Sequence, residues 1–291
     1  MIKKITRRLF LKRGLGSFFT VLGLGAGGYF YANRIETHLL EITSQEIQHP
    51  LIPKGFDGTR IVQFSDIHLG FQYNLPQFER LVKKINALHP DLIFFTGDLM
   101  DTPNKYLEIN KLVPILQLLK APLGKYCVFG NHDHGGYGSE IYRNIMRTAD
   151  FTVLLNESKP LKHKDGSRIY LLGIDDAMLG HPSLKNALKN VPQNMFKLLL
   201  SHAPDLAEAA SQYQIHWQLS GHSHGGQVKI PFVGALITPP FAQTYTEGLY
   251  KIAESDANPL MLYVNRGIGT TRLPFRFMAK PELTVFTLKS I

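Results

Sequence analysis

Cysteine is nearly missing from this sequence: Cys127 is the only one among 291 residues. An intramolecular disulfide is therefore excluded, and a chain of this length buries enough apolar surface not to need one. Cys127 lies in an apolar run with no charged neighbour that would activate a thiol, so we interpret it as a small buried side chain. The lack of a cysteine near the N-terminus also excludes a lipoprotein anchor.

Acidic residues are missing from residues 1–13, which carry Lys3, Lys4, Arg7, Arg8, Lys12 and Arg13. The formal net charge is +9, and setting these six aside leaves 26 basic residues against 23 acidic ones, a net charge of +3. The basic isoelectric point thus arises mainly at the N-terminus, and we expect no nucleic-acid partner. Internal repeats and low-complexity tracts are missing too, which favours one catalytic domain with short extensions.

The N-terminus has the three parts of an export signal: the basic start, an uncharged run over 14–33, and a polar segment from Arg34. Residues 6–12, Thr-Arg-Arg-Leu-Phe-Leu-Lys, resemble a twin-arginine signal, which implies export of the folded protein by the twin-arginine translocase. The alternative is a membrane anchor, since twenty residues of helix reach about 30 Å. Six glycines in that run weaken this alternative.

Both interpretations place the rest of the chain outside the cytoplasm, because the positive charge lies before the uncharged run. We therefore expect an extracytoplasmic protein, anchored in the membrane or associated with the cell wall. No clear Ala-x-Ala site follows the run, so cleavage stays open. The expected organisation is a signal or anchor over 1–33, a linker or edge strand over 34–55, and a catalytic domain over 56–291.

Five short polar clusters follow apolar, β-branched or aromatic runs at 60–64, 92–96, 126–129, 196–200 and 217–219. Each run predicts a core strand that ends at its cluster. Loops at the ends of strands are the usual place for catalytic groups. The clusters are Asp66-Ile67-His68, Gly97-Asp98, Gly130-Asn131-His132-Asp133, Ser201-His202 and Gly221-His222-Ser223-His224.

Helices are expected between these strands in the first half of the chain, at 76–89, 106–119 and 139–148. A helix at 183–189 and a short one at 204–212 follow, and further strands are expected at 151–155, 168–174, 227–230, 261–265 and 283–288. Alternation in the first half followed by a strand-rich second half predicts a layered α/β protein with two sheets.

The polar clusters contain seven candidate metal ligands: Asp66, His68, Asp98, Asn131, His202, His222 and His224. Carboxylate, imidazole and amide groups together suit Mn, Fe or Zn, and manganese is our first expectation. Seven ligands are too many for one ion. Two divalent ions about 3.5 to 4 Å apart that share one carboxylate account for the number and suit displacement at phosphorus.

The ordered motifs Asp-x-His, Gly-Asp, Gly-Asn-His-Asp, a later His and Gly-His-x-His resemble those of the calcineurin-like metallophosphoesterases over residues 57–288. The resemblance implies that Asp66, His68 and His224 hold one metal, that Asn131, His202 and His222 hold the second, and that Asp98 bridges them. It also implies that a metal-bound hydroxide attacks phosphorus, while His132 protonates or stabilises the leaving oxygen and Asp133 orients His132. The implied fold is a four-layer αββα sandwich of two mixed sheets.

Further segments resemble a subgroup of twin-arginine-exported cell-envelope phosphodiesterases of Gram-positive bacteria. They are Gly-Asn-His-Asp-His-Gly-Gly-Tyr, Gly-His-Ser-His-Gly-Gly-Gln and Asn265-Arg266-Gly267-Ile268-Gly269. We expect hydrolysis of an envelope phosphodiester, namely a polymer, a phospholipid or a lipid-linked nucleotide. One alternative is a UDP-2,3-diacylglucosamine-type pyrophosphatase, although no long apolar insertion provides an acyl-binding lid. The other is a non-catalytic wall-binding metalloprotein, which a missing ligand would favour.

Several other polar residues keep two interpretations each. Asp175 and Asp176 either face the site or cap a turn, and His134 either contacts substrate or lies at the surface. Three arginines of the C-terminal loop region either grip phosphate bidentately or are solvated. These are Arg266, Arg272 and Arg276.

Overall fold

The computed structural model describes residues 6–252 and 259–291, so Lys3 and Lys4 of the predicted signal lie outside the described residues. Two six-stranded mixed sheets form the body. The first sheet has the order β1 (Glu41–Gln48), β14 (Glu282–Lys289), β2 (Arg60–Phe64), β3 (Leu92–Phe95), β4 (Lys125–Cys127) and β5 (Phe151–Val153). Strands β2 to β5 are parallel, and β14 joins them antiparallel.

The second sheet has the order β12 (Gly248–Ile252), β13 (Leu260–Val264), β9 (Trp217–Ser220), β8 (Lys197–Leu200), β7 (Arg168–Gly173) and β6 (Glu157–Lys162). Its four central strands are parallel and its two edge strands are antiparallel. Strand β6 was missed by the sequence reasoning because an edge strand is largely exposed and carries little apolar alternation, and it tolerates Pro160.

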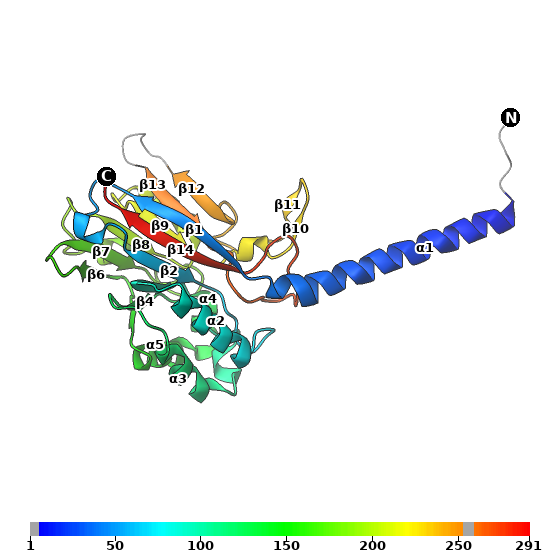
Figure 1. Ribbon diagram of the computed structural model, residues 1–291, viewed down its shortest axis with the longest axis horizontal. Helices are drawn as coiled ribbons and strands as arrows, with labels where there is room; N and C mark the ends of the chain where they lie inside the picture. Colours follow the sequence, from blue (N-terminus) through cyan, green and yellow to red (C-terminus); the bar gives the residue numbers. More distant parts are fainter. Residues whose placement is uncertain (1–5, 253–258) are drawn as a thin grey trace.

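Three apolar cores separate four layers. A central core, including Phe94 and Trp217, fills the space between the sheets. Helices α2 (Leu75–Ala87), α3 (Leu112–Gln117) and α5 (Ser139–Thr148) cover the first sheet, and α6 (Leu184–Ala187) and α7 (Ala207–Ser211) pack on the second. Figure 1 shows the first helical layer beneath its sheet. The predicted four-layer αββα sandwich of two mixed sheets is confirmed.

Helix boundaries follow local chemistry. Helix α5 has the predicted bounds, and α2 begins one residue before Pro76, with Asn74 and Gln77 forming a capping box. The helix expected over 106–119 is wrong in its first half, since α3 begins at Leu112. Pro114 explains this start, because a proline lacks the amide hydrogen and is tolerated only in a first turn.

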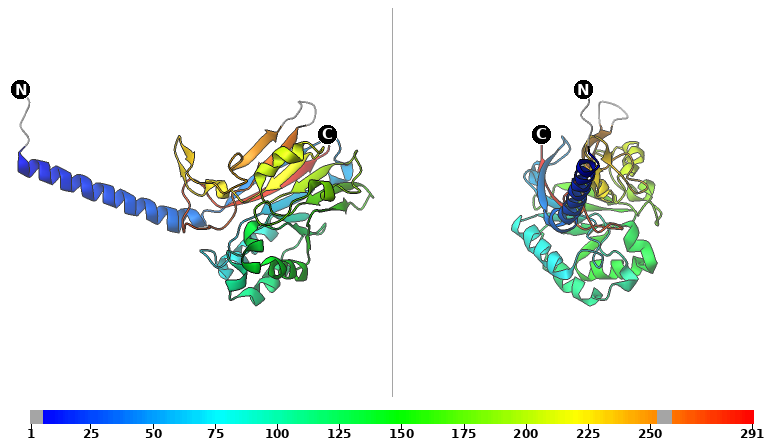
Figure 2. Two further views of the ribbon diagram at one scale, coloured as in Figure 1. Left: turned by 180° about the vertical axis from the view of Figure 1, so that it is seen from behind. Right: turned by 90° about the vertical axis from the view of Figure 1, so that its right-hand side faces the viewer.

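Helix α1 (Arg7–Phe30) projects from the body in the left view of Figure 2 and exposes most of its described side chains. No helix within the described residues is long and apolar enough to cross a membrane. Residues 34–55, expected as a linker or edge strand, include β1, which lies at the edge of the first sheet and pairs with β14 over its full length.

Residues that follow α1 pack against the C-terminal loop over 266–281. Tyr31 contacts Phe277 edge to face, and the Asn33 side-chain amide donates to the Pro274 carbonyl. The Glu36 carboxylate, 2% exposed, accepts a hydrogen bond of 2.7 Å from the Ala279 amide. Residues before position 34 therefore pack against the body of the protein.

Candidate metal centre

The predicted ligands lie together where strands of both sheets end. Strands β2, β3 and β4 of the first sheet and β8 and β9 of the second deliver them in the loops that follow. Six of the seven side chains belong to residues that are at most 4% exposed: Asp66, His68, Asp98, His202, His222 and His224. The seventh, Asn131, opens the single turn of α4 (Asn131–His134).

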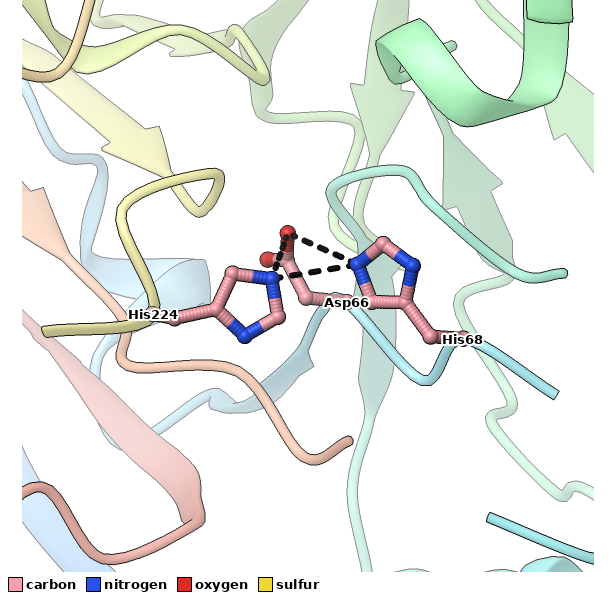
Figure 3. A group of neighbouring side chains, drawn as sticks. All are labelled: Asp66, His68 and His224. Carbon is pink, nitrogen blue, oxygen red and sulfur yellow. Dashed lines mark hydrogen bonds and ion pairs between the residues drawn. The ribbon is translucent and has the colours of Figure 1, made fainter. Parts of the chain in front are cut away.

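The first group consists of Asp66, His68 and His224, which point toward one another in Figure 3. The Nε2 atoms of the two imidazoles are 3.1 Å apart. Asp66 Oδ1 lies 3.4 Å from His224 Nε2 and 3.9 Å from His68 Nε2. Ligands about 2.1 Å from a common ion are separated by about 3 to 4 Å, so these three atoms suit one metal.

The second group consists of Asp98, His202 and His222. Asp98 Oδ2 lies 3.4 Å from His202 Nε2 and 3.5 Å from His68 Nε2 of the first group. One carboxylate oxygen therefore faces ligands of both groups. This is the geometry expected of a bridging ligand between two ions.

In two of the imidazoles, one ring nitrogen is occupied by a hydrogen bond to a backbone carbonyl. The other ring nitrogen is then free to bind a metal. His202 donates from Nδ1 to the Thr96 carbonyl at 2.6 Å, which leaves Nε2 as the ligand atom. His222 donates from Nε2 to the Pro240 carbonyl at 2.9 Å, which leaves Nδ1. Such contacts fix ring orientation and tautomer in metal sites.

The donor atoms fit divalent ions. Asn131 Oδ1 and His202 Nε2 are buried and have no hydrogen-bond partner within the described part of the chain. Buried polar atoms are almost always paired, because an unpaired one costs about 1 to 3 kcal/mol. Metal coordination would satisfy both atoms.

The electrostatics of the cluster also favour positive charge. Burial raises the pKa of Asp98, but the imidazoles of His202, His132 and His68 lower it by more, to well below the usual range. Burial lowers the pKa of His202, but Asp98 and Asp66 raise it by more, to about 10. Burial and the neighbouring His202 lower the pKa of His222 to about 4.

The loops that carry the ligands have unusual backbone conformations. Five ligand residues have a positive φ, between 50° and 69°: Asp66, His68, Asp98, His222 and His224. Non-glycine residues rarely adopt this region, and such strain concentrates at functional sites. The motif glycines are needed for close approach: a Cβ at Gly221 would lie 2.1 Å from Ser65 Oγ, and one at Gly130 would lie 2.2 Å from Asp98 Oδ1.

The structure corrects one predicted contact at the catalytic loop. Asp133 does not hydrogen-bond to the His132 ring; its carboxylate accepts from the backbone amides of Asp98, Leu99 and Gly130 at 2.8 to 3.0 Å. The ring is instead held by Asp101, whose carbonyl accepts from His132 Nδ1 at 2.7 Å. Asp133 thus joins two ligand loops, because its short side chain lies beneath the backbone rather than beside the ring.

Asp101 is a site residue that the sequence reasoning missed. Besides holding His132, its Oδ1 lies 3.3 Å from His68 Nδ1 on the side of that ring away from Asp66. A carboxylate behind a ligand imidazole raises its basicity. The available signal was its position three residues after Asp98, on the same loop.

Asp175, Asp176 and His134 make contacts with other protein groups. Asp175 Oδ1 contacts His134 Nε2 at 2.7 Å, and Asp176 caps a turn by accepting from the amides of Met178 and Leu179. Neither Asp175 nor His134 is among the residues that line the cleft at the metal ligands.

The three arginines have different environments. Arg266 is paired with Glu282, Glu41 and Glu247. Arg276 is fully buried and donates to backbone carbonyls, including those of Ala279 and Gly269. Arg272 is exposed, lines the cleft at the metal ligands, and forms no hydrogen bond or ion pair with another described residue.

Two packed mixed sheets with paired carboxylate and imidazole clusters at their strand ends define a metal-dependent phosphoester hydrolase. The chain belongs to the calcineurin-like phosphoesterases, whose family profile matches residues 59–226. The predicted family is thereby confirmed.

Relatives extend over nearly the whole chain. The uncharacterized metallophosphoesterase YkuE of Bacillus subtilis is 46% identical over 289 residues, 99% of each chain. A metallophosphoesterase of Aquifex aeolicus is 30% identical over 88% of this chain and 95% of its own. The UDP-2,3-diacylglucosamine pyrophosphatase LpxG of Chlamydia muridarum is 27% identical over 88% of this chain and 92% of its own.

Proposed function

We propose that this protein is an exported phosphodiesterase that hydrolyses a phosphodiester of the cell envelope with two divalent ions. One ion is assigned to Asp66, His68 and His224, and the other to Asn131, His202 and His222. The observation that carries the proposal is the position of Asp98 Oδ2, within 3.5 Å of ligand nitrogens from both groups. When bound, two such metal ions would supply positive charge at phosphorus and lower the pKa of a bound water.

The residues around the ion sites position the reacting groups. His132 lies at the edge of the cluster, half-buried, and its backbone amide donates to Asp98 Oδ1 at 2.8 Å. Because Nδ1 is occupied by the Asp101 carbonyl, Nε2 is the atom that would give a proton to the leaving oxygen. Asp101 is a positioning residue in this scheme, and Asp133 fixes the backbone of the two loops.

Manganese is the proposed metal, because the mixed oxygen and nitrogen ligands suit it, while Fe and Zn are the alternatives. Export by the twin-arginine translocase, and a final location at the membrane or cell wall, are proposed from the motif at residues 6–12.

A second candidate function is a pyrophosphatase that acts on a lipid-linked nucleotide. The similarity to LpxG over most of both chains favours it. A non-catalytic wall-binding role is a weaker alternative, since all seven ligand residues and His132 are present.

The test is manganese-dependent hydrolysis of bis(p-nitrophenyl) phosphate, compared with the corresponding monoester. Asp98→Ala should lose both the bound metal, measured by mass spectrometry of the purified protein, and diester turnover, because the bridging ligand serves both ions. Full metal content or full activity in this variant would overturn the assignment. Metal binding without turnover of either ester by the wild type would favour the pyrophosphatase or the binding role.

A further inference from the structure

A cleft of about 360 Å³ opens directly beside the metal ligands. One end is formed by polar groups of the site, among them Asn131, His132 and His222. The rest of its wall is mainly apolar, although the residues come from distant parts of the chain. They are Met178, Val228, Leu236, Ile237, Leu273 and Phe275.

Hydrogen bonds fix the shape of the apolar wall. The Gln227 side-chain amide donates to the carbonyls of Thr271 and Leu273 at 3.1 and 2.9 Å, and its oxygen accepts from the Thr271 amide. On the outer side, Tyr29 at the end of α1 contacts Phe275 edge to face at 5.8 Å. These contacts hold the segment 271–275 of the cleft wall in place.

Apolar side chains of this wall are exposed to solvent. Leu236 is 53% exposed, Ile237 70% and Leu273 41%. The hairpin of β10 (Lys229–Ile230) and β11 (Gly234–Ala235) continues this surface, with Phe232 and Val233 exposed at its tip. Figure 1 shows the hairpin near the end of α1 that adjoins the body. Contiguous exposed apolar surface usually marks a binding site.

We propose that this cleft binds a hydrocarbon chain of the substrate, which makes the substrate a lipid-linked phosphodiester. The inference rests on the proposed function, since it places the phosphate at the ions and the chain along the apolar wall. Arg272 is the one lysine or arginine among the described residues that line the cleft, so it is the residue that would supply positive charge from the cleft wall to the phosphate. A polar polymer or a glycan would need hydrogen-bonding groups along this wall, and the six apolar side chains offer none.

A series of p-nitrophenyl alkyl phosphates tests the proposal with the manganese-loaded protein. The esters carry methyl, butyl and octyl groups, so the reacting phosphate stays the same while the chain lengthens. We expect kcat/KM to rise by about two- to fourfold per methylene that enters the cleft, the factor that corresponds to burial of one CH₂. No dependence on chain length would overturn the proposal.

Leu236→Asp tests whether the dependence of kcat/KM on chain length arises in this cleft. A charge at this exposed position should not disturb folding. It should remove the dependence on chain length, so that within this variant the octyl ester has no higher kcat/KM than the methyl ester. Leu118→Asp is the matched control, since Leu118 is 54% exposed at the end of α3. A chain-length dependence retained in Leu236→Asp would also overturn the assignment to this cleft.

Calorimetry of methylphosphonate and octylphosphonate separates this inference from the proposed function. The wild type should bind octylphosphonate at least tenfold more tightly than methylphosphonate, and Leu236→Asp should bind the two alike. If no ester is hydrolysed but this preference is found, the proposed function fails and the cleft assignment stands. Equal binding of both phosphonates by the wild type refutes the cleft assignment.

Discussion

At the residue scale, Arg272 differs from Arg266 and Arg276 because its side chain has no partner among the described residues. Arg266 and Arg276 already have acidic or carbonyl partners, whereas Arg272 is exposed beside the metal ligands and pairs with none of the residues described. Sequence reasoning could not separate the three, because each lies in the same loop region and carries the same charge. Arg266 pairs with glutamates of other strands and loops, whereas Arg276 folds back on carbonyls of its own loop region, and neither arrangement leaves a sequence signal.

Arg272→Ala should therefore raise KM for an anionic diester with little change in kcat. A hydrogen bond to a charged group contributes about 1.5 to 3 kcal/mol when shielded, so for this exposed side chain we expect about a tenfold rise. Arg168→Ala is the control, because Arg168 begins β7 at the strand end away from the site. Equal KM values for the two variants would remove Arg272 from the substrate site.

His132→Ala should retain both metal ions and lose turnover. The residue contributes its backbone amide to Asp98, which alanine preserves, and its imidazole to proton transfer, which alanine removes. General acid catalysis contributes about 10²- to 10⁴-fold, so a loss of kcat in that range is expected. The metal content and the steady-state kinetics of the variant measure the two effects. Loss of metal would instead show that the His132 imidazole is a metal ligand.

At the element scale, the contact between His134 and Asp175 connects α4 with the loop that follows β7, and so links the two sheets. The His134 ring also stacks on Phe129 and contacts Ser139 Oγ at 2.8 Å. Burial lowers the pKa of His134, but the Asp175 carboxylate, helped by Asp176 and Asp133, raises it above its usual value. Burial raises the pKa of Asp175, but the hydrogen bond from His134 lowers it by more.

The stability contribution of this pair should depend on pH. The raised pKa of His134 gives stabilisation that is complete below the usual histidine pKa of about 6.5 and is lost as pH rises through the folded value. The lowered pKa of Asp175 gives stabilisation above about pH 4 that is lost in acid. The pair therefore stabilises most between about pH 4 and 6.5.

His134→Gln should lower the free energy of unfolding by about 1.5 to 3 kcal/mol at pH 6 and by less at pH 9. Urea titrations at the two pH values measure the difference, with His181→Gln as the control because His181 is exposed. A gap between wild type and variant that is the same at both pH values would contradict the ion pair.

At the scale of the whole molecule, the segment after α1 supports the metal centre from outside. Tyr31, Asn33 and Glu36 hold the loop that contains Arg276, and Arg276 Nη2 lies 3.2 Å from His224 Nδ1. A chain of contacts thus runs from residues outside the predicted catalytic domain to a metal ligand. The expected boundary at residue 56 could not include it, because the packing partner is more than 200 residues away.

A protein that begins at residue 29 should keep the melting temperature of the full chain, whereas one that begins at residue 40 should melt lower. Loss of the two hydrogen bonds and the ring contact should cost about 3 kcal/mol, which corresponds to about 6 to 12 °C. Differential scanning calorimetry of the three proteins provides the measurement. Equal melting temperatures for the two shortened proteins would show that residues 29–39 do not stabilise the body.

The sequence by itself determined the family and the four-layer fold, and it predicted the residues that the structure brings together in the candidate metal centre. Each motif consists of an apolar run followed directly by residues that can bind a metal. The pattern is therefore local, and the periodicity of strands and helices is enough to recognise it. Helix α5 was predictable for the same reason.

Only the tertiary structure decided which side chains of different loops meet. It replaced Asp133 by Asp101 as the partner of His132, separated Arg272 from two paired arginines, and assembled an apolar cleft from residues between 178 and 275. None of these contacts leaves a local pattern, because they depend on how closely two sheets pack and which loops then lie side by side.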